Sequence, residues 1–72
     1  MSYGNGLVSN VIEANQLTNT ILDTDLNNTK INIVHVTLLN AVVTLPVTVD
    51  DYIIWVEDAV AGGGNITVNQ AS

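Results

Sequence analysis

Residues 41–49 read Ala-Val-Val-Thr-Leu-Pro-Val-Thr-Val, and this stretch decides the fold class. Every odd position is apolar, while the even positions hold Val42, Thr44, Pro46 and Thr48. Alternation with a period of two places the apolar side chains on one face of a β-strand. Proline has no N–H to donate to a ladder, so Pro46 predicts either an edge strand or a strand broken in two.

Further strands are predicted on both sides of this stretch. Residues 52–58 are apolar on both faces as far as Glu57, which favours a central strand. A loop over 59–65 and a short alternating strand over 66–70 follow. Upstream, a strand begins near Lys30, changes phase after Val34 and ends or bends at Asn40. Short strands separated by turns, with no clean internal repeat, predict a mainly β fold: a small β-sandwich or a β-prism-like module.

The first part of the chain has a different composition. Residues 1–29 are rich in Asn and Thr, and their apolar residues are scattered. Leu7, Val8, Val11 and Ile12 would fit one face of a short helix, but strong helix formers are lacking. We therefore expect an N-terminal arm over 1–29, extended or irregular or carrying a short helix, and a β domain over 30–72.

Composition points to assembly with other chains. Seventy-two residues allow one domain at most, and the stabilisation from a core of that size only about equals the cost of ordering the chain. Small domains usually compensate with disulfides, a metal or oligomerisation. The chain has no cysteine and one histidine, His35, which excludes disulfides and disfavours a structural zinc site. Oligomerisation or docking on a larger partner remains.

The charge balance excludes two classes of partner. One basic residue against seven acidic ones gives a formal net charge of −6. Nucleic-acid binding then has almost no electrostatic basis, and anionic membrane surfaces are disfavoured for the same reason. No apolar run approaches the length of a membrane-spanning helix and no basic segment precedes one, so we expect neither a transmembrane helix nor a signal peptide.

The residues that could carry chemistry have simpler interpretations. Asp23, Asp25 and Asn27 have the opening spacing of a calcium loop, but its sixth position is Asn28 and its twelfth is Val34, which favours a polar turn. The pairs at 50–51 and 57–58 are interpreted as charges at strand ends, with calcium between subunits as the alternative. His35 is interpreted as a strand histidine. We predict no catalytic residue, no cofactor and no metal site, and thus no enzyme.

One region resembles a known class of protein. Val43-Thr44-Leu45-Pro46, the stretch 50–58 and the loop and strand 62–68 resemble a segment common in bacteriophage structural proteins. There a Thr-Leu-Pro strand leads through a turn to a strand ending in Asp, and a Gly/Asn-rich loop leads to an Asn-Ile-Thr-Val strand. The resemblance covers about residues 42–70. It departs at Tyr52, where a Gly-Asp turn would stand, and at Glu57, which replaces a Lys.

This resemblance implies a virion structural role, commonly as a homotrimer. The short chain favours a capsid decoration or cement protein on the capsid surface, whose partners are its own copies and the major capsid protein or another virion protein. A receptor- or glycan-binding tail-fibre or spike module is the alternative. We predict that the core or the subunit interface is formed by Val43, Leu45, Val47, Val49, Ile54, Trp55, Val56 and Ile66.

Overall fold

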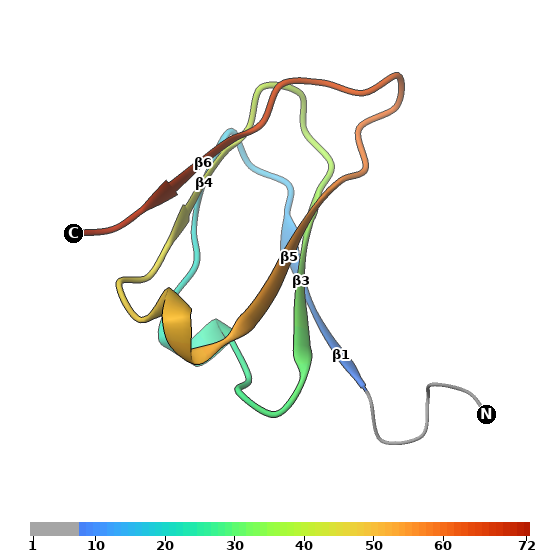
Figure 1. Cartoon of the computed structure of the whole chain (residues 1–72). Helices are drawn as coiled ribbons and strands as arrows, with labels where there is room; N and C mark the ends of the chain where they lie inside the picture. Colours follow the sequence, from blue (N-terminus) through green and yellow to red (C-terminus); the bar gives the residue numbers. More distant parts are fainter. Residues whose placement is uncertain (1–7) are drawn as a thin grey trace.

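A computed structural model describes residues 8–72 and confirms the mainly β fold. Six strands are present in this range, with two short 3-10 helices between them (Figure 1). The elements in chain order are β1 (Ser9–Ala14), β2 (Thr18–Thr20), η1 (Asp23–Asp25), β3 (Ile31–Val36), β4 (Val42–Leu45), η2 (Val49–Asp51), β5 (Ile53–Asp58) and β6 (Thr67–Gln70).

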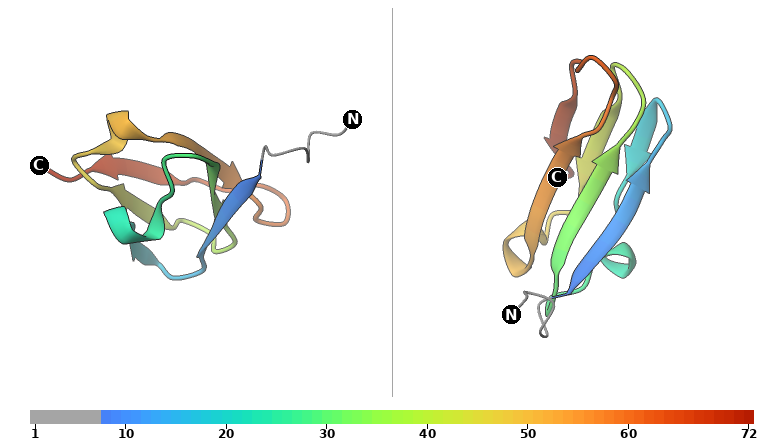
Figure 2. Two further views of the ribbon diagram at one scale, coloured as in Figure 1. Left: turned by 90° about the horizontal axis from the view of Figure 1, so that it is seen from below. Right: turned by 90° about the vertical axis from the view of Figure 1, so that its right-hand side faces the viewer.

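The six strands form two parallel sheets of three strands each. One has the order β1-β3-β5, called here the β1 sheet, and the other has the order β2-β4-β6, called the β2 sheet. The chain alternates between them, so that it winds as a flat coil of three turns (Figure 2). Parallel neighbouring strands need a long connection, and here each connection includes one strand of the other sheet.

The structure repeats although the sequence shows no clean repeat. In the β1 sheet Ser9 pairs with Ile31 and Ile31 pairs with Ile53. The two partners of each pair are therefore separated by the same number of residues along the chain. In the β2 sheet the corresponding partners are Thr18, Val42 and Thr67, because the connections between the sheets lengthen along the chain. Residues at equivalent positions of each turn therefore lie beside one another.

The core lies between the two sheets. Its buried apolar members come from β1, β3, β4 and the residues next to β2 and β4: Ala14, Ile21, Val34, Val36, Ala41, Val43 and Leu45. Of the eight residues predicted for the core or interface, Val43 and Leu45 are buried. Four more are partly buried and pack against the core: Val49, Ile54, Val56 and Ile66. Val47 and Trp55 are exposed and lie outside it.

A buried asparagine joins the three turns of the coil. The Asn32 side chain is fully buried. Its Oδ1 accepts hydrogen bonds from Asn10 Nδ2 (2.9 Å) and from the Asn27 N–H (2.8 Å). Its Nδ2 donates to the carbonyl oxygens of Asn27 (2.9 Å) and Ile53 (3.0 Å). Asn10 belongs to the first turn and Ile53 to the third, so one amide links neighbours on both sides.

The expected arm is part of the fold over its described residues. Within 1–29, the segments Ser9–Ala14 and Thr18–Thr20 are strands that pair with β3 and β4. They are extended, and no helix forms over residues 8–22. Asn and Thr are poor helix formers, and pairing with the parallel strands β3 and β4 gives the backbone N–H and C=O groups of this segment their hydrogen-bond partners. Residues 1–7 of the predicted arm lie outside the described residues.

Three details of the predicted strands are corrected by the topology. The strand predicted over 41–49 ends at Leu45, because the chain leaves the sheet at Pro46 and turns into η2. This strand, β4, is the central strand of its sheet and not an edge strand. The strand over 52–58, expected to be central, is the outer strand β5. β3 keeps a single phase, because its inward position 32 is a satisfied asparagine. The loop predicted over 59–65 is present, and it joins β5 of one sheet to β6 of the other.

A positive backbone angle explains the break at Asn40. This residue has φ of 61° in the turn between β3 and β4. Asparagine tolerates this left-handed conformation better than most residues, because its short side chain bonds locally. A turn is present at Asn40 as predicted, but the strand itself ends earlier, at Val36, and the turn leads the chain from the β1 sheet to the β2 sheet.

Replacing Asn32 by alanine should destabilise the fold. The change leaves the Asn27 N–H and the Ile53 carbonyl without their buried partner, which should lower the free energy of unfolding by about 2–4 kcal/mol. Urea denaturation at fixed protein concentration measures this loss. Asn28→Ala, at an exposed turn position, is the matched control and should change stability by less than about 0.5 kcal/mol. Equal midpoints for the two variants would contradict the role of Asn32.

Candidate functional site

The outer face of the β1 sheet carries a continuous apolar surface. Odd-numbered residues of its strands point away from the core, and the parallel register places them in rows. One row is Ser9, Ile31 and Ile53, and the next is Val11, Ile33 and Trp55. We call the five apolar members the outer patch: Val11, Ile31, Ile33, Ile53 and Trp55.

The outer patch is most exposed at its two edges. Val11 on β1 is 53% exposed, while Ile53 and Trp55 on β5 are 67% and 64% exposed. Ile31 and Ile33 on the central strand are half-buried because they have neighbours on both sides. Single exposed apolar residues are ordinary on protein surfaces, but a contiguous group of large ones indicates a site of interaction.

A polar row borders the outer patch. Glu13, His35 and Glu57 are register partners, so the histidine lies between the two glutamates. His35 Nδ1 lies 3.8 Å from Glu13 Oε2. Ser9 belongs to a row at the other end of the strands, and Asp51 belongs to η2, which precedes β5. A catalytic triad would need a serine and an aspartate beside His35. The register separates Ser9 and Asp51 from His35 along the strands, so these three residues do not form one.

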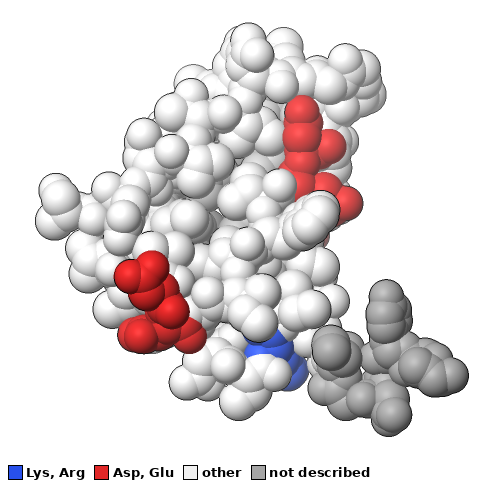
Figure 3. All heavy atoms as spheres, viewed as in Figure 1, with Lys and Arg blue, Asp and Glu red and all other residues white. Residues whose placement is uncertain are grey.

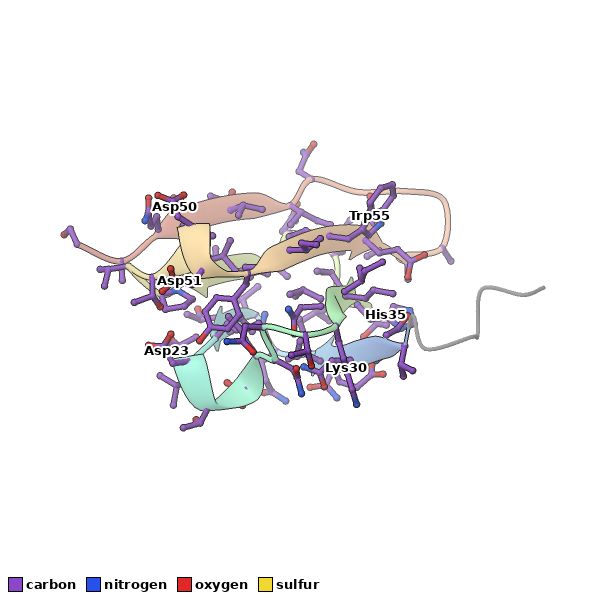
Figure 4. The ribbon with its side chains drawn as sticks, turned by 60° about the horizontal axis from the view of Figure 1, so that its bottom comes forward. Asp23, Lys30, His35, Asp50, Asp51 and Trp55 are labelled. Atoms are coloured by element: carbon purple, nitrogen blue, oxygen red, sulfur yellow. The ribbon has the colours of Figure 1, made fainter. Side chains whose placement is uncertain are left out.

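The acidic residues leave the outer patch uncharged. In Figure 3 the acidic atoms form two separate groups, and the basic atoms belong to Lys30. Figure 4 shows Asp23 and Asp51 on the side of the molecule opposite His35 and Trp55. None of the five patch residues is ionisable, so the charge that repels other copies of this acidic chain lies beside the surface rather than on it.

A hydrogen-bonded corner holds η1 against η2. The hydroxyl groups of Thr48 and Tyr52 both donate to Asp23 Oδ1, and the Tyr52 bond is 3.0 Å long. The bond that Tyr52 donates to Asp23 raises the pKa of the phenol above its usual value, and the nearby charges of Asp23 and Asp51 act in the same direction. This corner fastens the first turn of the coil to the second.

The carboxylates of the calcium-like segment have other partners. Asp25 Oδ2 accepts a hydrogen bond from the Leu22 N–H at 2.8 Å, and Asp23 accepts from Thr48 and Tyr52. Across residues 8–72, no three His, Cys, Asp or Glu side chains come close enough together to hold a metal ion. In the same range, no helix is long and apolar enough to cross a bilayer.

Sequence patterns predict only part of the outer patch. They indicate Trp55 as a core or interface residue, but they place Val11 in the arm and show Ile31 and Ile33 only as strand residues. A signal is nevertheless present: 10–14 and 32–36 both begin with Asn and continue with apolar residues at the third and fifth positions. The separation of these two segments along the chain matches the register of the sheet, in which Asn10 pairs with Asn32.

Comparison with known proteins adds no assignment to this description. No protein-family model, no curated protein and no solved structure matches the chain. The geometry of the outer patch and of the strand edges therefore supplies the evidence for function.

Alkaline pH should destabilise the protein through Tyr52. In the unfolded chain a tyrosine titrates near pH 10, whereas in the folded protein the hydrogen bond to Asp23 raises the pKa of Tyr52 and stabilises the protonated phenol. The contribution is fully present below about pH 10 and is lost as the pH rises through the folded pKa. Melting temperatures measured between about pH 9 and pH 11 should fall more steeply for the wild type than for Tyr52→Phe. Parallel curves would contradict this account.

Proposed function

We propose that this chain is a virion structural protein, a capsid decoration or cement protein of a bacteriophage that stabilises the shell by packing with other chains. The observation that carries the proposal is the outer patch, an uncharged apolar surface on an acidic molecule. The resemblance of residues 42–70 to phage structural segments supplies the virion context. The mechanism is burial of surface rather than a chemical reaction.

The outer patch favours more than one contact for each chain. Its three strands, at ~4.8 Å between strands and ~3.3 Å per residue, cover about 300 Å² in projection. Specific interfaces usually bury ~800 Å² on each partner. A single pairing of two patches is therefore too small to be stable alone. A homotrimer seated on a larger shell protein increases the buried area, which agrees with the trimer implied by the resemblance.

The polar row limits how the patches can meet. Glu13 and Glu57 lie at one end of the outer face, with His35 between them. Chains packed about a three-fold axis along the patch would place these carboxylates at the rim, where water and counterions reach them. The apolar centre and charged rim are the usual anatomy of a protein interface.

Val11→Lys should separate the subunits at the outer patch without unfolding them. Val11 is 53% exposed, so lysine there should change the stability of one chain by less than about 0.5 kcal/mol. A charge buried in the interface should weaken assembly at least about tenfold. Native mass spectrometry measures the loss of trimer, and sedimentation with shells of the encoding virus measures the loss of binding. Leu17→Lys, at an exposed turn, is the control.

A result against this proposal is readily defined. If Val11→Lys assembles and binds shells as the wild type does, the outer patch is not the contact surface. If particles of the encoding virus contain no copies of the chain, the decoration role is wrong, whatever the oligomeric state of the isolated protein.

The second candidate is a receptor- or glycan-binding tail-fibre or spike module. The observation in its favour is Trp55, which is 64% exposed on the outer face. Exposed tryptophan can stack on a sugar ring, as aromatic residues do at many binding sites. On this alternative, Trp55→Ala abolishes glycan or host-cell binding while circular dichroism shows an intact fold. A wild-type chain that binds neither glycans nor host cells excludes it.

A further inference from the structure

The third turn of the coil has a free edge. β5 and β6 are outer strands, and both lie at the same end of the two sheets. The Ala59 N–H donates to Val36 and the Thr67 N–H donates to Ala41. Successive residues of a strand point their backbone N–H and C=O groups to opposite sides. Those of Ile54, Val56 and Val68 therefore point sideways, away from the neighbouring strands β3 and β4. Within residues 8–72 no strand lies on that side.

The interior of the coil is also open at this end. Val56 is the register partner of Val34, and Val68 is the partner of Val43. Val34 and Val43 are fully buried, whereas Val56 is half-buried and Val68 is 47% exposed. The difference arises because the second turn has a neighbour on both sides and the third has one. The third turn therefore presents inward-facing aliphatic side chains together with unpaired backbone groups.

The first turn is finished differently. Its inward-facing Ala14, Asn19 and Ile21 are buried, whereas Ile12, which pairs with Val34 from the other side as Val56 does, is half-buried. The Asn19 side chain donates to the carbonyl oxygens of Gln16 and Val42 and accepts from the Gln16 N–H. β1 and β2 are also outer strands, but at the position equivalent to Val68 this end has the buried, hydrogen-bonded amide of Asn19 in place of an exposed aliphatic side chain. The two ends are therefore not matched surfaces.

We propose that the open end pairs with the open end of a second copy of the chain. A two-fold axis perpendicular to the coil joins β5 to β5 and β6 to β6 in antiparallel pairs. Both sheets then continue across the junction and the inward-facing aliphatic residues meet. The contact is isologous, so it closes as a dimer, with the outer strands β1 and β2 of each copy at the two far ends.

The placement of charge distinguishes this pairing from head-to-tail stacking. If the coil continued in its own register, Glu57 would lie beside Glu13 of the next copy. Like charges directly opposite each other on neighbouring strands are unfavourable. In the antiparallel pair centred on Trp55, the same face is kept and Glu57 lies opposite Ile53 of the second copy. The carboxylates of the two copies are then at opposite ends of the pair.

The proposal is tested in the Val11→Lys background, which removes contacts through the outer patch. Sedimentation velocity should give a dimer for Val11→Lys and a monomer after Val68→Lys is added, since a charge would then point into the junction. Adding Leu17→Lys instead, at an exposed position of the first turn, should leave the dimer. A dimer that Val68→Lys leaves unchanged would overturn the proposal.

Hydrogen exchange tests the strand pairing directly. In the Val11→Lys dimer, the amides of Val56 and of residue 68 should exchange at least about tenfold more slowly than in the monomer that carries both Val11→Lys and Val68→Lys. Val68→Pro is a second variant, since position 68 directs its N–H away from β4 and an outer strand tolerates proline there. Fast exchange of these amides in a wild-type monomer would overturn the proposal. Protection that appears only with shells would assign the edge to a shell protein instead.

The two proposals fail in distinguishable ways. If the outer patch makes no contact, the Val11→Lys chain has the same state of assembly as the wild type and the Val68 variants still report on the free edge. If the free edge makes no contact, the Val68 variants keep the wild-type assembly while Val11→Lys loses it.

Discussion

The Asn32 side chain is the interaction on which the coil depends. Its amide is fully buried and makes hydrogen bonds to the Asn10 side chain, the Asn27 backbone and the Ile53 carbonyl. A buried amide without these partners would be strongly unfavourable, so the position is compatible only with the stacking that supplies them. The asparagine therefore specifies the register in which the three turns lie, in addition to stabilising them.

The register determines which surfaces the molecule offers. Because strands of the β1 sheet are displaced by a constant step along the chain, similar residues fall into rows: an apolar pair of rows and a row of two glutamates around His35. A fold built by stacking turns also has two ends, and each must be closed or paired. In this chain the first end has the buried Ala14 and Asn19 beside a half-buried Ile12, while the third turn presents the half-buried Val56 and the exposed Val68.

These surfaces suit a protein that acts by assembly. Asp23 and Asp25 have partners within the chain, since Asp23 holds η1 against η2 and Asp25 binds the backbone of Leu22. Apolar area is displayed on the outer face and at the open end, the two places where another chain can cover it. A small β-structured subunit gains stability from such contacts that its own core cannot supply.

The sequence by itself determined the strands after residue 30, because strict alternation of apolar residues with turn residues between them reports local β-structure. It also determined the turn at Asn40 and the burial of Val43 and Leu45. Only the tertiary structure decided that all pairs are parallel, that β4 is central and β5 outer, and that residues 9–20 belong to the sheets. Strand pairing joins residues that are a whole turn of the coil apart, and local patterns carry no information on which edge faces which. Trp55 is an example. The sequence predicts that it lies in a strand, but its exposure depends on the position of β5 at the edge of the sheet.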